Sequence, residues 1–190
     1  VDIFPGFPAQ NYLTDESGRV IGIATGDMGI DKEGNQKGTY TPGMDILAKQ
    51  TIFAEGARGH LGKRLIKEFN LDEGKTPQHF AIGFKEVWEV DNNKHSPGDV
   101  VHSMGWPLKG GTSGGGFLYH FENNRIAVGL IIDLNYSNPS HNTFQEFQQF
   151  KQHPSIKQYL ESGKRVSYGA RAITKGGINS LVKMEFDGGM

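Results

Sequence analysis

Apolar and polar residues alternate in short runs through the first third of the chain, the pattern that predicts β-strands. The runs cover residues 2–7, 11–14 and 19–25, with turn-forming residues between them. We expect these runs to form a small β-meander. A longer apolar run at 45–53 predicts a strand buried in a larger sheet.

The same alternation returns in the middle of the chain. Residues 80–90, 100–106, 117–121 and 125–134 each read as a strand, and the last two are joined by Glu122-Asn123-Asn124, which favours a hairpin. These runs predict a second, antiparallel sheet. A final apolar run at 181–186 predicts a strand that rejoins the sheet begun by the first part.

Helical spacing is confined to three segments. Between residues 60 and 69, apolar residues recur three or four positions apart among lysine, arginine and glutamate. Residues 143–150 and 155–162 are also expected to be helical, with a break at Pro154. The phenylalanines of the second helix are interpreted as core residues.

The order of these elements predicts a mixed α+β fold with an interleaved organisation. Residues 1–74 and 166–190 are expected to share one domain, and residues 75–165 to form an antiparallel sheet with inserted helices. No Pro-rich or Ser-rich linker separates the parts, so an interface between them is expected.

Charge and composition exclude several functions. The formal net charge is −1, and the 20 Lys and Arg residues form no basic run, which argues against nucleic acid as the main partner. Cysteine is absent, so no disulfide, thiolate nucleophile or cysteine-ligated metal centre can form within these residues. No stretch reaches the roughly 18 apolar residues of a membrane-spanning helix. The start at Val1, without an initiator Met or targeting pattern, predicts an internal piece of a longer protein.

The strongest chemical signal is a glycine-rich segment at 105–120 that runs directly into an aromatic stretch. Consecutive glycines leave backbone N–H groups without side-chain cover, so a flat or anionic ligand can approach the main chain. Glycines that only permit tight turns or close strand packing are the structural alternative.

Short catalytic motifs in the chain lack the context that they require. Ser113 lies in a G-x-S-x-G pattern, but a loop precedes it and a strand follows, whereas a nucleophile elbow needs a strand and then a helix. The segment 56–64 resembles a phosphate loop with wrong spacing and with Arg64 at the magnesium-binding position. The histidines show no metal-binding spacing. His102 and His120 are kept as candidates for a proton relay, with a structural role the more common alternative.

Several blocks together resemble the electron-transfer-flavoprotein:ubiquinone oxidoreductase family. The most specific block reads Gly-Trp-Pro-Leu, then a glycine run, then Phe-Leu-Tyr-His, at 105–120. The resemblance covers essentially the whole chain in order. The other blocks lie at 22–29, 51–56, 59–61, 153–156 and 168–172.

This resemblance implies an oxidoreductase that moves electrons from reduced electron-transfer flavoprotein to ubiquinone, using FAD and a four-iron four-sulfur cluster. Residues 1–74 and 166–190 would then be parts of an incomplete Rossmann-like FAD-binding domain of the glutathione-reductase type, and 75–165 the ubiquinone-binding domain. The cluster ligands and the membrane-docking elements would lie outside the chain. The parent protein is expected on the inner face of a bacterial cytoplasmic membrane or the matrix side of the mitochondrial inner membrane, and the isolated piece is expected to be inactive.

The resemblance also assigns site residues. Family members use the glycines matching Gly114 and Gly115 to contact a quinone carbonyl, and apolar residues nearby could line a slot for the ring and tail. The slot residues would be Trp106, Phe117 and Leu118. Glu55, Gly56, Gly177 and Asn179 would lie near FAD. No catalytic acid or base and no metal ligand is expected here. Ser113, where relatives place an aromatic residue, and Lys109-Gly110-Gly111 depart from the family pattern.

Two other functions stay open at this point. A geranylgeranyl-reductase-like, FAD-dependent prenyl reductase would also combine a flavin domain with an apolar sheet. A non-catalytic lipid-binding or partner-binding β-domain would use its glycines only for structure.

Overall fold

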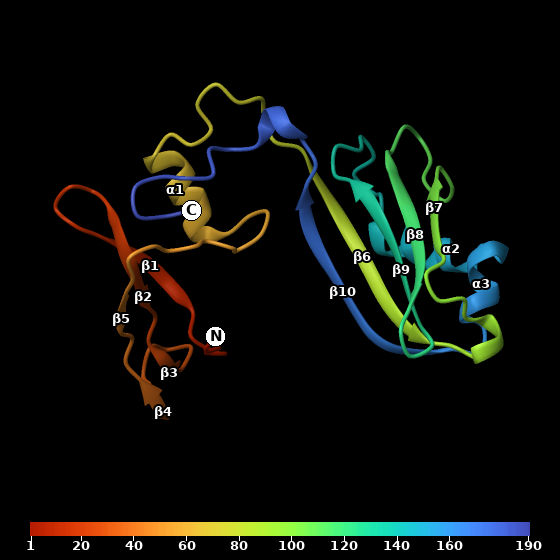
Figure 1. Ribbon diagram of the computed structural model, residues 1–190, viewed down its shortest axis with the longest axis horizontal. Coiled ribbons are helices and arrows are strands. Elements are labelled where there is room, and N and C mark those ends of the chain that lie inside the picture. The colour runs from red at the N-terminus through yellow and green to blue at the C-terminus, as the bar shows by residue number, and fades with distance from the viewer. The chain divides into compact units, whose positions relative to one another are not determined.

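The computed structural model describes all residues, 1–190, and the chain divides into two compact units (Figure 1). The first unit contains Val1–Thr76 and Asn179–Met190, and the second contains Pro77–Ile178. The expected boundary at 165/166 differs from this division. Residues 166–174 stay in the second unit because they belong to strand β10, which pairs with β6 along its whole length.

A five-stranded antiparallel sheet forms the second unit, in the order β10-β6-β9-β8-β7. Both the mixed α+β class and the antiparallel sheet are therefore confirmed. Strands β7 and β10 lie at the two edges. The strands are β6 (Phe80–Glu89), β7 (Val100–Met104), β8 (Gly114–Phe121), β9 (Arg125–Asp133) and β10 (Lys164–Thr174).

Helices α2 (Thr143–Gln152) and α3 (Pro154–Leu160) cover one face of this sheet (Figure 1). The side chain of Asn142 caps α2 by accepting a hydrogen bond from the N–H of Gln145. Pro154 is the first residue of α3, a position at which the backbone N–H has no partner within the helix. Apolar side chains of α2 and α3 pack against alternate residues of β8 and β9. This core consists of Val90, Leu118, Ile126, Val128, Leu130, Ile132, Phe147, Phe150, Ile156 and Leu160.

Glycines allow close approaches on both faces of the sheet. A Cβ at Gly116 would lie 2.2 Å from the ring of Phe150 in α2, and one at Gly129 would lie 2.3 Å from the ring of Phe117. Each distance is far below van der Waals contact, so these positions require glycine. Helix α2 can therefore seat an aromatic ring directly on β8.

The first unit is built on smaller sheets and one helix. Its core joins Tyr12 and Val20 to Leu61 and Leu65 of the helix. The expected strand at 45–53 is shorter in the structure, and residues 2–7 and 181–186 form no strand. The elements are β1 (Ala9–Thr14), β2 (Val20–Thr25), β3 (Met28–Ile30), β4 (Gln36–Thr41), β5 (Asp45–Leu47) and α1 (His60–Glu68).

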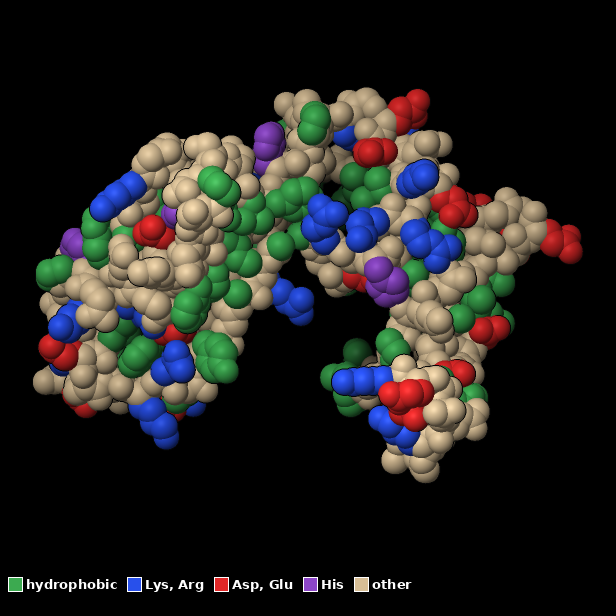
Figure 2. Space-filling model, turned by 180° about the vertical axis from the view of Figure 1, so that it is seen from behind, with side chains coloured by type: hydrophobic (Ala, Val, Ile, Leu, Met, Phe, Trp, Pro, Cys, Tyr) green, Lys and Arg blue, Asp and Glu red, His purple; other side chains and the backbone are tan.

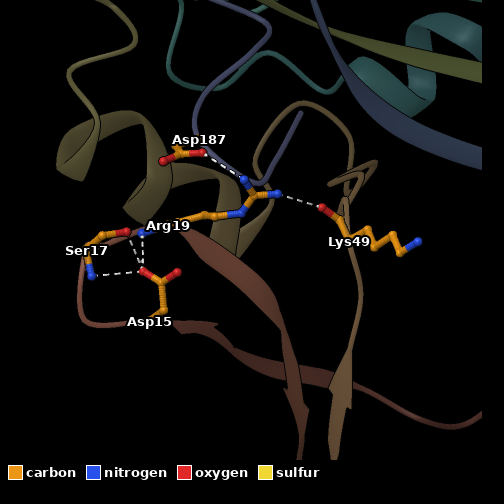
Figure 3. Close-up of polar contacts among 5 residues, drawn as sticks. All are labelled: Asp15, Ser17, Arg19, Lys49 and Asp187. Carbon is orange, nitrogen blue, oxygen red and sulfur yellow. Dashed lines mark hydrogen bonds and ion pairs between the residues drawn. The ribbon is translucent and has the colours of Figure 1, made fainter.

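The C-terminal segment is tied to this unit around the turn after β1 (Figure 3). Arg19 lies between the carboxylate of Asp187, 3.5 Å away, and the carbonyl of Lys49, 3.0 Å away. Asp15 accepts the backbone N–H groups of Ser17 and Arg19, and the hydrogen bond from the Ser17 hydroxyl holds the pKa of the Asp15 carboxyl below its usual range. The return of the chain is thus fixed by polar contacts as well as by packing.

A buried ion pair connects α2 to the sheet. The Glu86 side chain is 3% exposed, and its two oxygens accept the Nζ of Lys151 at 3.0 and 2.9 Å. Arg165 Nη1, at 3.2 Å, and Trp88 Nε1, at 2.8 Å, complete its partners. A buried carboxylate is tolerated only when it is paired and hydrogen-bonded in this way.

His120 is a second buried polar group on the covered face, at the far end of β8. Its Nδ1 accepts the N–H of Ser96 at 3.1 Å, and its ring contacts His95 and Tyr159. Burial, and to a lesser extent His95, lowers the pKa of His120, while Asp99 opposes the shift. The neutral imidazole is therefore the form that fits the fold.

Removing the amine from the buried pair should be costly. In Lys151→Met, Glu86 keeps only a partly exposed arginine as charge partner, so we expect a loss of about 3 kcal/mol in unfolding free energy. Urea denaturation of the chain measures it. Lys157→Met, which removes an exposed lysine of α3, is the control and should change stability by less than about 0.5 kcal/mol. Equal effects of the two changes would contradict the buried pair's role.

Protonation of His120 should weaken the fold in acid. The pKa of His120 is lower in the folded state than in the unfolded chain. The contribution of neutral His120 to the unfolding free energy is therefore complete above about pH 6.5, the unfolded pKa, and is lost as the pH falls through the lower pKa of the folded state. His120→Gln should therefore flatten the fall in unfolding free energy between about pH 7.5 and about pH 5.5, measured by urea denaturation. The exposed His102→Gln control should keep the wild-type slope, and an unchanged slope in His120→Gln would refute the assignment.

Candidate functional site

The twin glycines expected to meet a ligand lie in strand β8, which begins three residues before the strand expected at 117–121. The N–H of Asp133 donates to the carbonyl of Ser113 at 2.9 Å, which fixes the phase of the β8–β9 ladder. Bonded and non-bonded pairs alternate in an antiparallel ladder, so Gly115 exchanges its hydrogen bonds with Ile131. The expectation that the Gly115 amide is exposed for a ligand is therefore wrong. Gly114 directs its N–H and C=O to the other side, toward β7.

The β7 side follows the same alternation, fixed by the bond from the His120 N–H to the carbonyl of Asp99 at 2.9 Å. Hydrogen-bonded pairs recur at every second residue of β8, so the pair at His120 is followed by one at Leu118 and one at Gly116. The pair of Gly116 with Ser103 is the last one before β7 ends. Strand β7 ends one residue later, before any residue stands in register with Gly114. The peptide groups of Gly114 therefore face the end of β7, which makes this end of the sheet the candidate site.

Only glycine fits at position 114. A Cβ there would lie 2.2 Å from the backbone carbonyl of Ile131 and 2.5 Å from the side chain of Leu108. The loop from Gly105 to Ser113 reaches this point through a fully buried Pro107. Close packing thus brings the loop against the start of β8.

The three apolar residues predicted to form one slot are not together. Phe117 and Leu118 are neighbours in a strand and point to opposite faces of the sheet. Leu118 is completely buried in the core under the helices, so its prediction as a slot residue is wrong. Trp106 is 46% exposed in the loop after β7, with its ring 5.2 Å from that of His153.

The predicted flavin contacts lie elsewhere, and Glu55 is already engaged. Its carboxylate accepts the N–H groups of Leu61 at 3.3 Å and Gly62 at 2.6 Å, and contacts His60 Nδ1 at 3.1 Å. Glu55 thus satisfies donors at the start of α1, a helix that has no side-chain cap at its own N-cap position, Gly59.

The remaining flavin candidates are two glycines and one asparagine, with Gly56 and Asn179 in the first unit and Gly177 in the second. Gly56 and Gly177 have φ values of +83° and +73°, and no atom lies within 4 Å of a Cβ built on either. The carbonyl of Asn179 accepts the N–H of Thr76 at 3.0 Å. Neither glycine is therefore required by close packing, and the positive φ values explain the residue type at both positions.

The proposed histidine relay does not form. His102 is exposed on β7, whereas His120 is buried on the covered face and bonded to Ser96. No group of three or more potential metal ligands occurs in the structure. None of its helices has the length and apolar character needed to cross a bilayer.

A cavity that no sequence pattern indicated lies at the same end of the sheet as Gly114. The cavity has a volume of about 440 Å³ and contains the pair Lys175 and Asp133, whose Nζ and carboxylate oxygens are 2.6 Å apart. The two residues are far apart in the sequence, and only the pairing of β6 with β9 and β10 brings them together. Gln78, His79, Phe80, Leu134 and Asn135 complete the lining.

Comparison with known proteins identifies relatives over the whole chain. The family described as "ETF-QO, ubiquinone-binding" matches residues 80–173. The electron transfer flavoprotein-ubiquinone oxidoreductase of Pseudomonas aeruginosa is 63% identical over 190 residues, covering 100% of this chain and 34% of that protein. The mitochondrial protein of the same name from Homo sapiens is 47% identical over 192 residues, covering 100% of this chain and 31% of its own length. The chain thus spans about a third of these relatives.

Solved structures share the fold at much lower identity. A geranylgeranyl bacteriochlorophyll reductase-like protein from Thermoplasma acidophilum has a TM-score of 0.61 at 18% identity, covering 96% of this chain and 40% of that one. A triple mutant of the flavin-dependent brominase Bmp2 has a TM-score of 0.55 at 10% identity, covering 97% and 42%. At these identities the likeness shows the arrangement of the elements.

Replacing Glu55 tests whether it serves α1. Glu55→Ala removes the acceptor of two helix N–H groups, so we expect about 1 kcal/mol less unfolding free energy in urea denaturation of the chain. Glu16→Ala, in an exposed turn, should leave stability within about 0.5 kcal/mol. Unchanged stability of Glu55→Ala would exclude the capping role.

Proposed function

Because the chain belongs to the electron transfer flavoprotein-ubiquinone oxidoreductase family, we propose that it supplies the quinone-binding region of such an enzyme. The whole protein would take electrons from reduced electron-transfer flavoprotein and pass them to ubiquinone. FAD and a four-iron four-sulfur cluster would carry the electrons. The chain has no cysteine, so the cluster ligands would lie in the rest of the protein.

The observation that carries the proposal is the direction of the Gly114 peptide groups. They face the end of β7, where no residue of that strand stands in register. A quinone carbonyl is a hydrogen-bond acceptor on a flat ring, and a backbone N–H beside a position without a side chain suits both properties. Of the two glycines expected to contact the quinone, the proposal therefore keeps only Gly114.

Apolar residues near Gly114 complete the proposed site. Trp106 lies in the loop that leads toward Gly114, and Phe117 lies on the uncovered face of the sheet. We place the quinone ring near Trp106, whose loop packs beside Gly114, and assign no role to Leu118; Phe117 stays a prediction on the other face of the sheet. Apolar walls exclude water and fix the ring, which is what the protein contributes when cofactors carry the redox chemistry.

We place FAD beside backbone groups and not beside the Glu55 carboxylate, which α1 and His60 already engage. Gly56 would approach the cofactor closely, because no neighbouring atom occupies the space that a side chain would fill. Gly177, which belongs to the other unit, stays a prediction from the family resemblance. Glu55 would act indirectly, by ordering the start of α1. Bound FAD supplies the hydride and single-electron chemistry that amino-acid side chains lack. Asn179 is retained as a candidate for a hydrogen bond to the flavin.

The prenyl-reductase alternative has less support. Its structural counterpart is 18% identical, which supports a common fold, whereas relatives named for ubiquinone reduction reach 63%. The non-catalytic alternative predicts that the glycines serve packing alone, and close packing does require glycine at 114, 116 and 129. The direction of the Gly114 peptide groups, toward the end of β7 instead of a strand partner, is what favours a ligand contact. We place the whole enzyme at the inner face of an energy-transducing membrane.

A substitution at Gly114 in the full-length enzyme tests the proposal. Gly114→Ala displaces the start of β8, so we expect quinone reduction to fall on the order of a hundredfold, because small misplacements of a bound reactant are that costly. Reduction of the bound flavin by electron-transfer flavoprotein should be unchanged. Stopped-flow absorbance of the flavin and steady-state quinone reduction measure the two steps separately.

The control for this change is Gly38→Ala, because no atom lies within 4 Å of a Cβ at Gly38. It should keep both rates. Equal quinone turnover in Gly114→Ala and the wild type, with FAD bound in both, would reject the proposed contact.

A further inference from the structure

Strand β7 exposes large apolar side chains along an edge of the sheet. Met104 is 89% exposed, Val100 61% and Val101 43%, and Trp106 follows at 46%. Hydrophobic side chains reach the surface at several places on the face seen in Figure 2, so one exposed residue would mean little. Here four of them lie within seven residues of an edge strand and its following loop, where soluble proteins usually place charges.

The charge pattern of this edge is one-sided. No Asp or Glu occurs between Asp99 and Glu122, a span that includes β7, the glycine loop and β8. Lys109 is exposed at the tip of the loop, and His102 is exposed on the strand. A surface that combines apolar side chains with positive charge and lacks carboxylates suits the interface of an anionic bilayer.

This edge is continuous with the proposed quinone site. Met104 stands in register with Gly115, and Trp106 follows two residues later in the loop that packs beside Gly114. A quinone with a long isoprenoid tail is dissolved in the hydrocarbon of the membrane, so the opening through which it enters must lie close to lipid. Tryptophan is also the residue most suited to the level of the headgroups.

We propose that the edge formed by Val100, Val101, Met104 and Trp106, which we term the β7 edge, contacts the interfacial layer of an anionic phospholipid membrane. This inference rests on the proposed quinone site, and it adds a membrane contact within a chain whose membrane-docking elements were expected elsewhere. The contact is shallow: Met104 and Trp106 enter the interface while Lys109 meets lipid phosphates. It brings the lipid to the end of the sheet at which Gly114 faces its ligand.

Two other surfaces are rival occupants. The relatives are about three times as long as this chain, so another part of the protein could cover the β7 edge. A second copy could also pair with the edge strand. A protein interface would also be poor in carboxylates. The observation that favours lipid is the exposed Lys109 beside the apolar edge, since a lysine next to apolar side chains suits the phosphates of an anionic bilayer.

The test uses the full-length enzyme and quinone-free vesicles of phosphatidylcholine and phosphatidylglycerol. The deciding measurement is quenching of Trp106 fluorescence by brominated acyl chains, obtained as the difference between the wild type and Trp106→Phe. We expect clear quenching by the brominated lipid and weak quenching by acrylamide once vesicles are present. Trp106 that no brominated lipid quenches would overturn the proposal, whether another segment or a second copy covers it.

A charge placed on the edge provides a second readout. Met104→Glu should lower vesicle binding in flotation at least about fivefold, because it places a carboxylate against anionic lipid. Met184→Glu, at a methionine that is 64% exposed in the other unit, is the matched control and should float as the wild type does. Equal loss in both variants, or none in either, would count against the β7 edge as the contact.

Quinone assays separate this inference from the proposed function. With a water-soluble short-tail quinone and no vesicles, Met104→Glu should turn over at the wild-type rate, whereas with long-tail quinone in vesicles its rate should fall about fivefold, in step with binding. Loss of both activities in Gly114→Ala with intact lipid quenching would support the quinone site and the membrane contact independently. Lipid quenching in an enzyme that reduces no quinone would sink the proposed function and leave the membrane contact standing.

Discussion

The register that holds β8 between β7 and β9 is the constraint on which the second unit depends. It places Gly116 under the ring of Phe150 and Gly129 under the ring of Phe117, so that neither face tolerates a side chain at these points. A shift by one residue would exchange the two faces and move Leu118 from the core to the surface. The same register leaves Gly114 beyond the last residue of β7. Packing in the core and the direction of the candidate ligand contact are therefore set together.

A buried ion pair reinforces this arrangement. Glu86 lies on the face covered by α2, where an unpaired carboxylate would be costly, and it meets Lys151 from the helix and Arg165 from β10. Three elements distant in sequence thus share one buried acid. The ion pair fixes the position of α2 over β8, where Phe150 lies against Gly116. Apolar packing alone would define that position less precisely.

Elements whose apolar residues recur with a regular spacing could be predicted from the sequence. Elements whose position depends on tertiary contacts could not. The hairpin of 117–121 and 125–134, the helix at 60–69 and the break at Pro154 follow from alternation, spacing and proline chemistry, and the structure confirms them. Strand β10 was missed because nearly all of its residues are exposed and show no alternation. The expected strand began only at 117 because glycine disfavours strands in isolation, whereas β8 begins at Gly114, where Phe150 and Ile131 occupy the space of the missing side chains. Leu118 was misplaced for the same reason, since its face follows from the register that begins at those glycines.

The entry and exit of the second unit are also set by strand pairing. β6 begins and β10 ends side by side, with Phe80 opposite Thr174 and the Lys175 N–H bonded to the carbonyl of His79 at 2.7 Å. A module whose two ends abut can be inserted into a host domain, or exchanged for another, while the host chain needs to bridge only the width of a strand pair. The inserted sheet can therefore change in sequence as its ligand changes, while the fold and the cofactor site of the surrounding domain stay the same.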